Sequence, residues 1–166
     1  YHTIPSSVTV PTDADGAIVV GAIYHVDDSL ESFSSNGPTN NGNKTPTVVA
    51  PDGVTTDAYD TEPFYGTSAA APHVAGIVAL LLEQNPDITP AEILSMLEDN
   101  ADAESVGLTS TSDNAFGFGK ADAYNLIGGS ELEIPDWIKN NADWWSQGLI
   151  DDDSFVNGIQ FMITKE

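Results

Sequence analysis

The chain has 166 residues, of which 40% are hydrophobic, so it can form one modest folded core and is not typical of a disordered protein. It has no cysteine, which excludes disulfides and thiolate metal sites. Its 26 acidic residues against four lysines give a formal net charge of −22, which argues against binding to nucleic acid or anionic lipid, because the phosphates would repel it.

The first part of the chain alternates polar loops with short apolar runs. Residues 1–16 are rich in Pro, Thr, Ser and Asp and indicate a surface loop. Residues 17–26 form an apolar, β-branched run typical of a strand buried on both faces of a parallel sheet. Residues 34–46 hold Asn-Gly and Gly-Pro pairs and predict a loop. A short strand is predicted over residues 47–50, followed by an acidic, aromatic loop over residues 51–65.

The middle of the chain predicts helices. They are expected over residues 68–83, 90–100 and 120–126. The first helix must stop at Asn85, because the following Pro86 disfavours helical geometry in the residue before it. The second helix begins with a capping box, in which Thr89 is the N-cap and Glu92 lies three residues later.

The most informative stretch is residues 66–76, which read Gly-Thr-Ser-Ala-Ala-Ala-Pro-His-Val-Ala-Gly. It puts Ser68 between small residues and then runs into an apolar segment typical of a buried helix, residues 77–82. A serine at a helix N-terminus lies beside unpaired N–H groups and the positive end of the helix dipole. Acyl transfer through a tetrahedral oxyanion needs such a field.

This stretch resembles the serine motif of the subtilisin-like serine proteases, the subtilases. Four further segments resemble other parts of the family pattern, in the family's order. They are residues 18–23 (the core strand after the oxyanion region), 32–38 (the Phe-Ser-x-x-Gly turn), 49–54 (the Ala-Pro-Gly loop, with Asp52 inserted) and 117–123 (the closing Gly-x-Gly turn and last helix). The resemblance implies an α/β fold, the C-terminal part of a subtilisin-like three-layer α/β/α domain with a parallel sheet, plus a small helical tail.

The tail has a different character from the rest. Residues 134–163 carry all three tryptophans in a helical pattern. We therefore predict a peptidase-like portion over residues 1–128, a linker over 129–133 and a Trp-rich helical hairpin over 134–166. The hairpin resembles a module found at the C-termini of some archaeal exported proteins, which implies surface attachment or self-association. The alternative is an extra hairpin that packs on the main domain.

The resemblance implies that Ser68 is the catalytic nucleophile and that its backbone N–H is one oxyanion donor. The other motif residues receive structural roles: Gly66, Thr67, Pro72, His73 and Gly76. By its backbone freedom Gly66 suits a tight turn before the serine, and Gly76 suits close packing of the helix on the sheet. Pro72 removes one hydrogen bond from the helix.

A serine protease also needs a base, a carboxylate that orients the base, and an oxyanion hole. In subtilases the Asp and His lie far upstream of the serine, whereas 67 residues precede Ser68 here. The family's oxyanion Asn lies in a Gly-Asn motif, and residues 1–16 contain no such pair. We therefore expect an N-terminally truncated part of the domain that is inactive alone.

None of the three histidines is a strong candidate for the base. His73 follows Ser68 by five residues on the same helix, so its ring points away from the hydroxyl. In the resembling family this position hydrogen-bonds inside the domain. His25 ends a strand and His2 lies in a terminal loop, and we assign neither to catalysis.

The remaining signals bear on cofactors and partners. Asp57, Asp60 and Glu62 are close in sequence, but their spacing matches no EF-hand loop, so we expect no metal or cofactor and keep calcium as an open alternative. The chain has no run of 18 apolar residues, so no membrane span is expected. The expected partner is a polypeptide substrate and the expected location is extracellular or at the cell surface, although no signal peptide is visible.

Two functions remain open. One is a serine endopeptidase that uses Ser68 for acyl transfer, and the other is a non-catalytic, subtilase-derived binding or surface module. An α/β-hydrolase is excluded by the motif, because its Gly-x-Ser-x-Gly elbow needs a glycine where Ala70 stands.

Overall fold

The structure is a computed structural model that describes residues 6–8, 12–14, 16–59, 62–128, 147–151 and 154. The chain divides into two compact units, Tyr1–Gly129 and Ser130–Glu166. The helices and strands below all belong to the first unit. Most of the predicted linker and Trp-rich hairpin lies outside the described residues, so the proposed domain boundaries stay a prediction.

Two strands form the sheet of the first unit. β1 (Val20–Tyr24) and β2 (Val48–Asp52) pair in parallel, with Val20 opposite Val48 and Tyr24 opposite Asp52. The predicted parallel pairing is confirmed. β1 is shorter than predicted at both ends, and just before it the Val19 N–H donates to the Thr47 hydroxyl at 3.1 Å.

Three helices follow in the predicted order. They are α1 (Thr67–Gln84), α2 (Pro90–Asp99) and α3 (Ala123–Leu126). α1 and α2 end within one residue of their predicted bounds. α3 starts three residues later than predicted, because Lys120 pairs with Asp102 in an antiparallel bridge and Asp122 caps the helix by accepting the Asn125 N–H.

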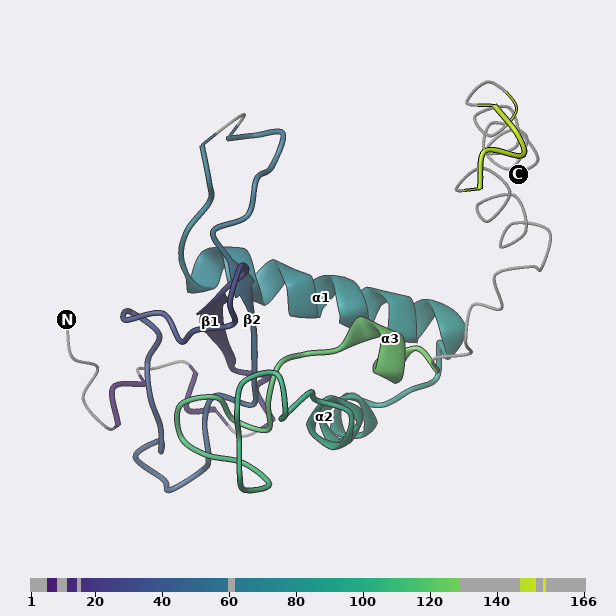
Figure 1. Cartoon of the computed structure of the whole chain (residues 1–166). Helices are drawn as coiled ribbons and strands as arrows, with labels where there is room; N and C mark the ends of the chain where they lie inside the picture. The colour runs from purple at the N-terminus through teal and green to yellow at the C-terminus, as the bar shows by residue number, and fades with distance from the viewer. Residues whose placement is uncertain are drawn as a thin grey trace. The chain divides into compact units, whose positions relative to one another are not determined.

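The core lies between the strands and the three helices. Alternate strand residues face it, as the two-residue period of a strand requires. Its buried members are Ala22, Val48 and Ala50 of the strands, Ala70, Val74, Ile77 and Leu81 of α1, Ile93 and Leu97 of α2, and Leu126 of α3. Figure 1 shows the two strands beside the N-terminal part of α1, and α3 between α1 and α2. This arrangement confirms the predicted α/β class.

The opposite face of the strands is covered by the loop that joins them. The Ser34 hydroxyl accepts the N–H of Ala22 at 3.0 Å, and both groups are buried. A Cβ on Gly21 would lie 2.9 Å from Val49 Cγ1 and 3.0 Å from Ser34 Oγ, so only a glycine lets the loop approach this closely. The loop therefore fixes the strands from the side away from the helices.

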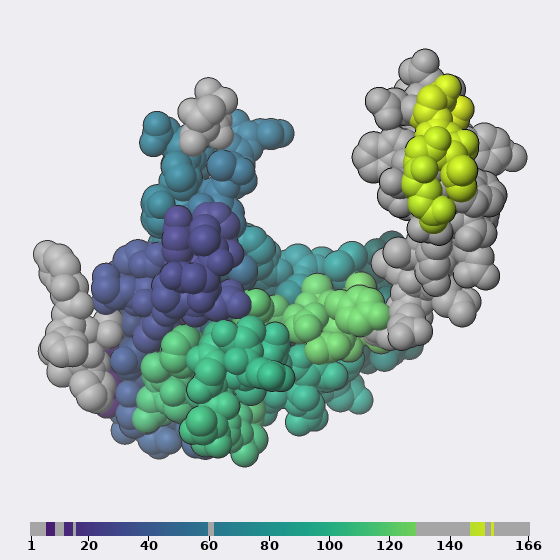
Figure 2. All heavy atoms as spheres, viewed as in Figure 1, coloured from purple at the N-terminus to yellow at the C-terminus, as the bar shows by residue number. Residues whose placement is uncertain are grey.

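A second loop leads from β2 back to the start of α1. Val54 and Phe64 pair across it, and the Phe64 N–H donates to the Val54 carbonyl at 2.8 Å. The rings of Tyr59 and Phe64 stack with centroids 4.7 Å apart. Figure 2 shows this loop standing out from the body of the unit. Because its two arms are paired, the loop returns the chain to the carboxyl end of β2, where α1 begins.

Candidate active site

Ser68 is the second residue of the 18-residue helix α1, and it is exposed. No side chain caps this helix, and its first turn carries no acidic residue. Within the described part of the chain, neither the Ser68 hydroxyl nor the N–H groups of Thr67 and Ser68 have a hydrogen-bond partner. The serine therefore lies where the helix dipole and unpaired donors favour a negative charge.

The turn before the serine depends on Gly66. Its φ of 123° and ψ of 161° lie in a region that is essentially restricted to glycine. The Gly66 carbonyl accepts the N–H of Ala69 at 2.8 Å and that of Ala70 at 3.3 Å, so it starts the helical hydrogen bonds. The tight turn predicted at Gly66 is present.

Pro72 also acts on the serine. It lies inside α1, four residues after Ser68, and has no N–H to donate. The helical hydrogen bond that it removes is therefore the one to the Ser68 carbonyl. Neither the N–H nor the C=O of Ser68 therefore takes part in the regular hydrogen bonds of the helix.

The prediction for Gly76 needs correction. We expected close packing of the helix on the sheet, but Gly76 is exposed and a Cβ built there meets nothing within 4 Å. The residues of α1 that face the strands are Ala70, Val74 and their neighbours one turn along the helix. Gly76 lies on the other side of α1, and within the described residues nothing covers it.

Neither described histidine contacts the serine. The Nδ1 atom of His73 hydrogen-bonds the Ala69 carbonyl at 2.9 Å, on its own helix. His25 lies just after β1, with Nδ1 3.1 Å from the carbonyl oxygen of Asp52 and its ring edge-on to Tyr24. His2 lies outside the described residues. The chemistry that the described chain brings to Ser68 is the helix N-terminus and not a base.

Two acidic residues near the serine turn, Asp52 and Glu31, were given no functional role by sequence reasoning. Asp52 is fully buried, and its Oδ2 accepts the Gly66 N–H at 2.8 Å. Burial and the negative charge of Asp52 raise the pKa of the Glu31 carboxyl. The signal available in the sequence was an acidic residue inside an apolar strand, Val-Val-Ala-Pro-Asp.

Two tyrosines complete these surroundings. The ring of Tyr24, at the end of β1, stacks on that of Tyr65 with centroids 6.5 Å apart. Partial burial and the neighbouring Tyr24 raise the pKa of the Tyr65 hydroxyl. Tyr65 directly precedes the glycine of the serine turn. Both rings lie against Gly53, the first residue after β2.

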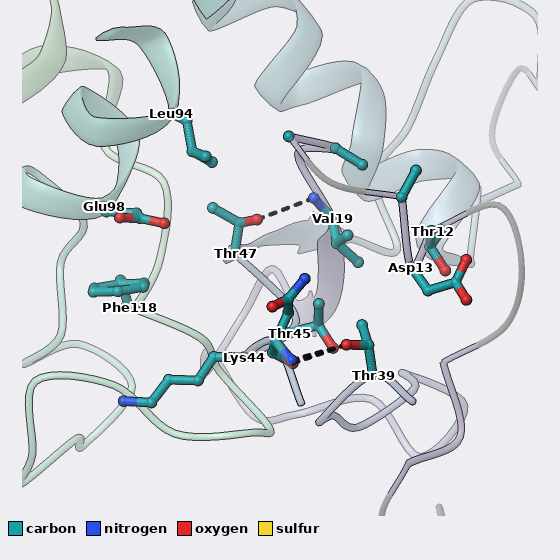
Figure 3. Close-up of a pocket in the computed structure, with 14 residues that line it drawn as sticks. Thr12, Asp13, Val19, Thr39, Lys44, Thr45, Thr47, Leu94, Glu98 and Phe118 are labelled. Atoms are coloured by element: carbon teal, nitrogen blue, oxygen red, sulfur yellow. Dashed lines mark hydrogen bonds between the residues drawn. The ribbon is translucent and has the colours of Figure 1, made fainter. Parts of the chain in front are cut away.

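A cavity of about 350 Å³ lies next to the first turn of α1. It is lined by Val54, Thr55, Thr56, Phe64, Ala69, Pro72 and His73. A separate cavity of about 270 Å³ has no lining residue from α1. Figure 3 shows Leu94, Glu98 and Phe118 facing this second cavity from one side and Thr12 and Asp13 from the other. Of these two cavities, the first lies next to the residues that follow Ser68 on α1, Ala69, Pro72 and His73.

No group of three or more His, Asp or Glu side chains among the described residues could hold a metal ion. Asp60, one of the acidic residues weighed for calcium, lies outside them. No described helix has the length and apolarity needed to cross a bilayer.

Comparison with known proteins decides the family. A family model for the subtilases matches residues 3–119. The chain belongs to the subtilase family. The predicted resemblance and the predicted subtilisin-like fold are therefore both confirmed. Membership supports a serine-type peptidase function at the level of the family.

The relatives of this subtilase are longer than the chain. It is 33% identical over 151 residues to the serine protease AprX of Bacillus subtilis, a match that covers 75% of this chain and 33% of AprX. It is 40% identical over 89 residues to kexin of Saccharomyces cerevisiae, a match that covers 48% of this chain and 10% of kexin. The chain thus spans a third or less of the length of these two relatives.

Solved subtilase structures agree with the sequence matches. The Clostridium perfringens CspB protease superposes with a TM-score of 0.63 at 27% identity, covering 74% of this chain and 28% of CspB. Fervidolysin from Fervidobacterium pennivorans gives a TM-score of 0.59 at 25% identity, covering 75% of this chain and 21% of that protein.

Proposed function

We propose that this chain is the nucleophile-bearing, C-terminal part of the catalytic domain of a serine endopeptidase. Oγ of Ser68 attacks the scissile carbonyl of a polypeptide, and its proton passes to a base. The base returns the proton to the leaving amine as the C–N bond breaks, which leaves an ester on Ser68. Water then hydrolyses this ester and regenerates the serine.

One observation carries the proposal: Ser68 is exposed at the start of α1, beside N–H groups that have no acceptor among the described residues. When a carbonyl oxygen becomes an oxyanion, the Ser68 N–H is a donor available to it. The field of the helix stabilises the same charge. Both contributions are stronger in the transition state than in the substrate, as catalysis requires.

We further propose that the base, its carboxylate and the side-chain oxyanion donor come from residues outside these 166, so that the chain alone is inactive. The contacts of His25 and His73 support this, since both rings bind backbone carbonyls rather than the serine. Leu80 and Leu82 of α1 are 44% and 41% exposed. Large apolar side chains left exposed in this way fit a surface that another part of the domain covers.

The remaining proposals concern the setting of the enzyme. A polypeptide is the proposed substrate, and the extracellular space or the cell surface is the proposed location. An excess of acidic residues keeps such a surface soluble where salt screens its self-repulsion. Residues 134–166 are proposed to serve surface attachment or self-association.

The experiment is fluorophosphonate labelling of the full-length protein that contains this chain. The wild-type protein and the Ser68→Ala variant are compared with Ser95→Ala, which removes an exposed serine of α2. We expect labelling of the wild type and of Ser95→Ala and none of Ser68→Ala. If all three proteins stay unlabelled while folded, the non-catalytic module is the correct function.

A further inference from the structure

The end of β2 holds a carboxylate that is buried beside the serine turn. Asp52 is 0% exposed, although an aspartate is almost never fully buried unless it is paired. Taking a carboxylate out of water is costly, and hydrogen bonds to the charged form offset that cost. The donor that Asp52 has is the Gly66 N–H, 2.8 Å from its Oδ2.

The position of Ser68 depends on the backbone of Gly66. Its carbonyl is held by the first turn of α1, through the N–H groups of Ala69 and Ala70. Its N–H is held by Asp52. The residue is therefore fixed on both sides, in a conformation that only glycine adopts readily. Two residues further on, the Ser68 hydroxyl and N–H take their direction from this turn.

The chain turns sharply at Gly53, directly after Asp52. Directly after Asp52, Gly53 has a φ of 67°, and a Cβ there would lie 2.9 Å from a ring atom of Tyr24 and 3.0 Å from one of Tyr65. The chain thus bends sharply under two rings as soon as the strand ends. Asp52 is also the residue by which this loop departs from the Ala-Pro-Gly pattern of the family.

Glu31 is the second acidic group at this place. Burial and, after it, the negative charge of Asp52 raise the pKa of the Glu31 carboxyl. Asp52 Oδ1 is buried and has no hydrogen-bond partner in the described part of the chain. A protonated Glu31 is a donor of the kind that this oxygen lacks.

We propose that Asp52 is a positioning residue for the nucleophile: its carboxylate fixes the Gly66 peptide and thereby aims the Ser68 hydroxyl and N–H. Asp52 touches neither substrate nor reacting atoms and acts through Gly66. The inference rests on the proposed function of Ser68. It assigns a role to the one inserted residue that the family pattern leaves unexplained.

The test uses the full-length protein with Asp52→Ala, Asp52→Asn and Asp52→Glu. Asp52→Ala removes the acceptor, Asp52→Asn keeps an acceptor oxygen in place without the charge, and Asp52→Glu moves the carboxylate by one methylene. We expect Asp52→Ala to slow fluorophosphonate labelling and kcat about 100-fold, with KM changed less than about threefold. Asp52→Asn should keep the labelling rate within about tenfold of wild type, and the labelling rate of Asp52→Glu should be well below that of Asp52→Asn.

A matched control is Asp113→Ala. The Asp113 carboxylate also accepts backbone N–H groups, those of Ala115 and Phe116, but it lies outside the serine turn. Its removal should lower the melting temperature and leave the labelling rate of the folded protein unchanged. Hydrogen exchange of the peptide that carries Gly66 gives a readout without catalysis, and it should quicken in Asp52→Ala but not in Asp113→Ala.

The outcomes separate the two proposals. A folded Asp52→Ala protein that is labelled at the wild-type rate overturns the positioning role and leaves Ser68 as the nucleophile. An unlabelled wild type contradicts the proposed function itself, and the positioning role with it. If Asp52→Ala does not fold, the labelling rates of the other two variants test the proposal. A faster rate for Asp52→Asn than for Asp52→Glu supports the positioning role, and equal rates contradict it.

Discussion

The two long helices of this subtilase begin in opposite ways. At the start of α2, the Thr89 hydroxyl accepts the Glu92 N–H at 3.3 Å, and the Glu92 carboxylate accepts the Thr89 N–H at 2.8 Å. At the start of α1, no side chain caps the helix and the leading N–H groups have no partner among the described residues. One helix terminus is closed by its own sequence, and the other is left open at Ser68.

The comparison separates stability from function. A closed terminus stabilises its helix, since a capping residue typically contributes about 1 kcal/mol. An open terminus gives up that contribution and keeps its donors for a charge that arrives from outside. At the start of α1 the turn is stabilised instead by the hydrogen bond from the Gly66 N–H to the buried Asp52 carboxylate. Changes at the two termini should therefore have different effects.

The largest effect is expected from Gly66→Ala. A side chain at φ 123° and ψ 161° costs about 1–3 kcal/mol, and a displaced turn slows acylation of Ser68 about 100-fold. Labelling rate and melting temperature of the full-length protein are measured together. Gly107→Ala is the control, because Gly107 also has a positive φ, 70°, and open space around it. Gly107→Ala should lose stability and keep the wild-type labelling rate. Equal labelling rates for Gly66→Ala and Gly107→Ala would contradict the special role of the turn.

A smaller effect is expected when α1 is made to resemble α2. Thr67→Asp adds a negative charge to the exposed first residue of α1. The charge interacts favourably with the helix dipole and should raise stability by about 0.5 kcal/mol. It also occupies the field that the oxyanion needs, so acylation should slow about tenfold. Thr67→Asn is the uncharged control, and a rate for Thr67→Asp equal to that of Thr67→Asn argues against an electrostatic role for this terminus.

At α2, Thr89→Ala should affect stability alone. The loss of the cap should lower the free energy of unfolding by about 1 kcal/mol, with no change in the labelling rate. Hydrogen bonds from the Thr89 side chain and N–H lower the pKa of Glu92 below its ordinary value of 4.5. The contribution of Glu92 is therefore present above pH 4.5 and is lost as the pH falls. Thermal melting above and below pH 4.5 checks the loss of stability and its pH dependence. A slower labelling rate in Thr89→Ala would contradict the proposed difference between the two helix termini.

The smallest effect is expected from Glu31→Gln. Because the pKa of Glu31 is raised above 4.5, the folded protein holds this proton more tightly than the unfolded chain does. The resulting stabilisation is fully present below pH 4.5 and is lost as the pH rises through the folded pKa. A glutamine stays neutral, so the variant should gain about 0.5 kcal/mol at neutral pH and nothing in acid. Thermal melting of the wild type and of Glu31→Gln in acid and at neutral pH checks this, and an equal difference at both pH values would contradict it.

Local signals in the sequence predicted the elements well. The capping box at Thr89 and Glu92 lies within four residues, so the start of α2 can be read without knowledge of the fold. The apolar run before Tyr24 and the small residues around Ser68 have the same local character. This is why the parallel strands, α1 and the exposed serine were predicted close to their observed positions.

Contacts between distant segments were not predictable in this way. Asp52 meets Gly66, 14 positions further along the chain, across an irregular loop, and no periodicity relates the two. Gly76 was wrongly expected to pack on the sheet, because its motif gives its neighbours but not the side of the helix on which it lies. The inserted aspartate in an apolar strand was a usable signal, since a buried acid needs a donor nearby.

The most direct test of the account is to trap the acyl-enzyme. The full-length protein is mixed with an ester substrate, quenched in acid, digested and analysed by peptide mass spectrometry. We predict the acyl group on Ser68, in the peptide that begins α1, and its absence in Ser68→Ala. An acyl group on another residue, or substrate turnover that persists in Ser68→Ala, would contradict the claim that the open N-terminus of α1 carries the nucleophile.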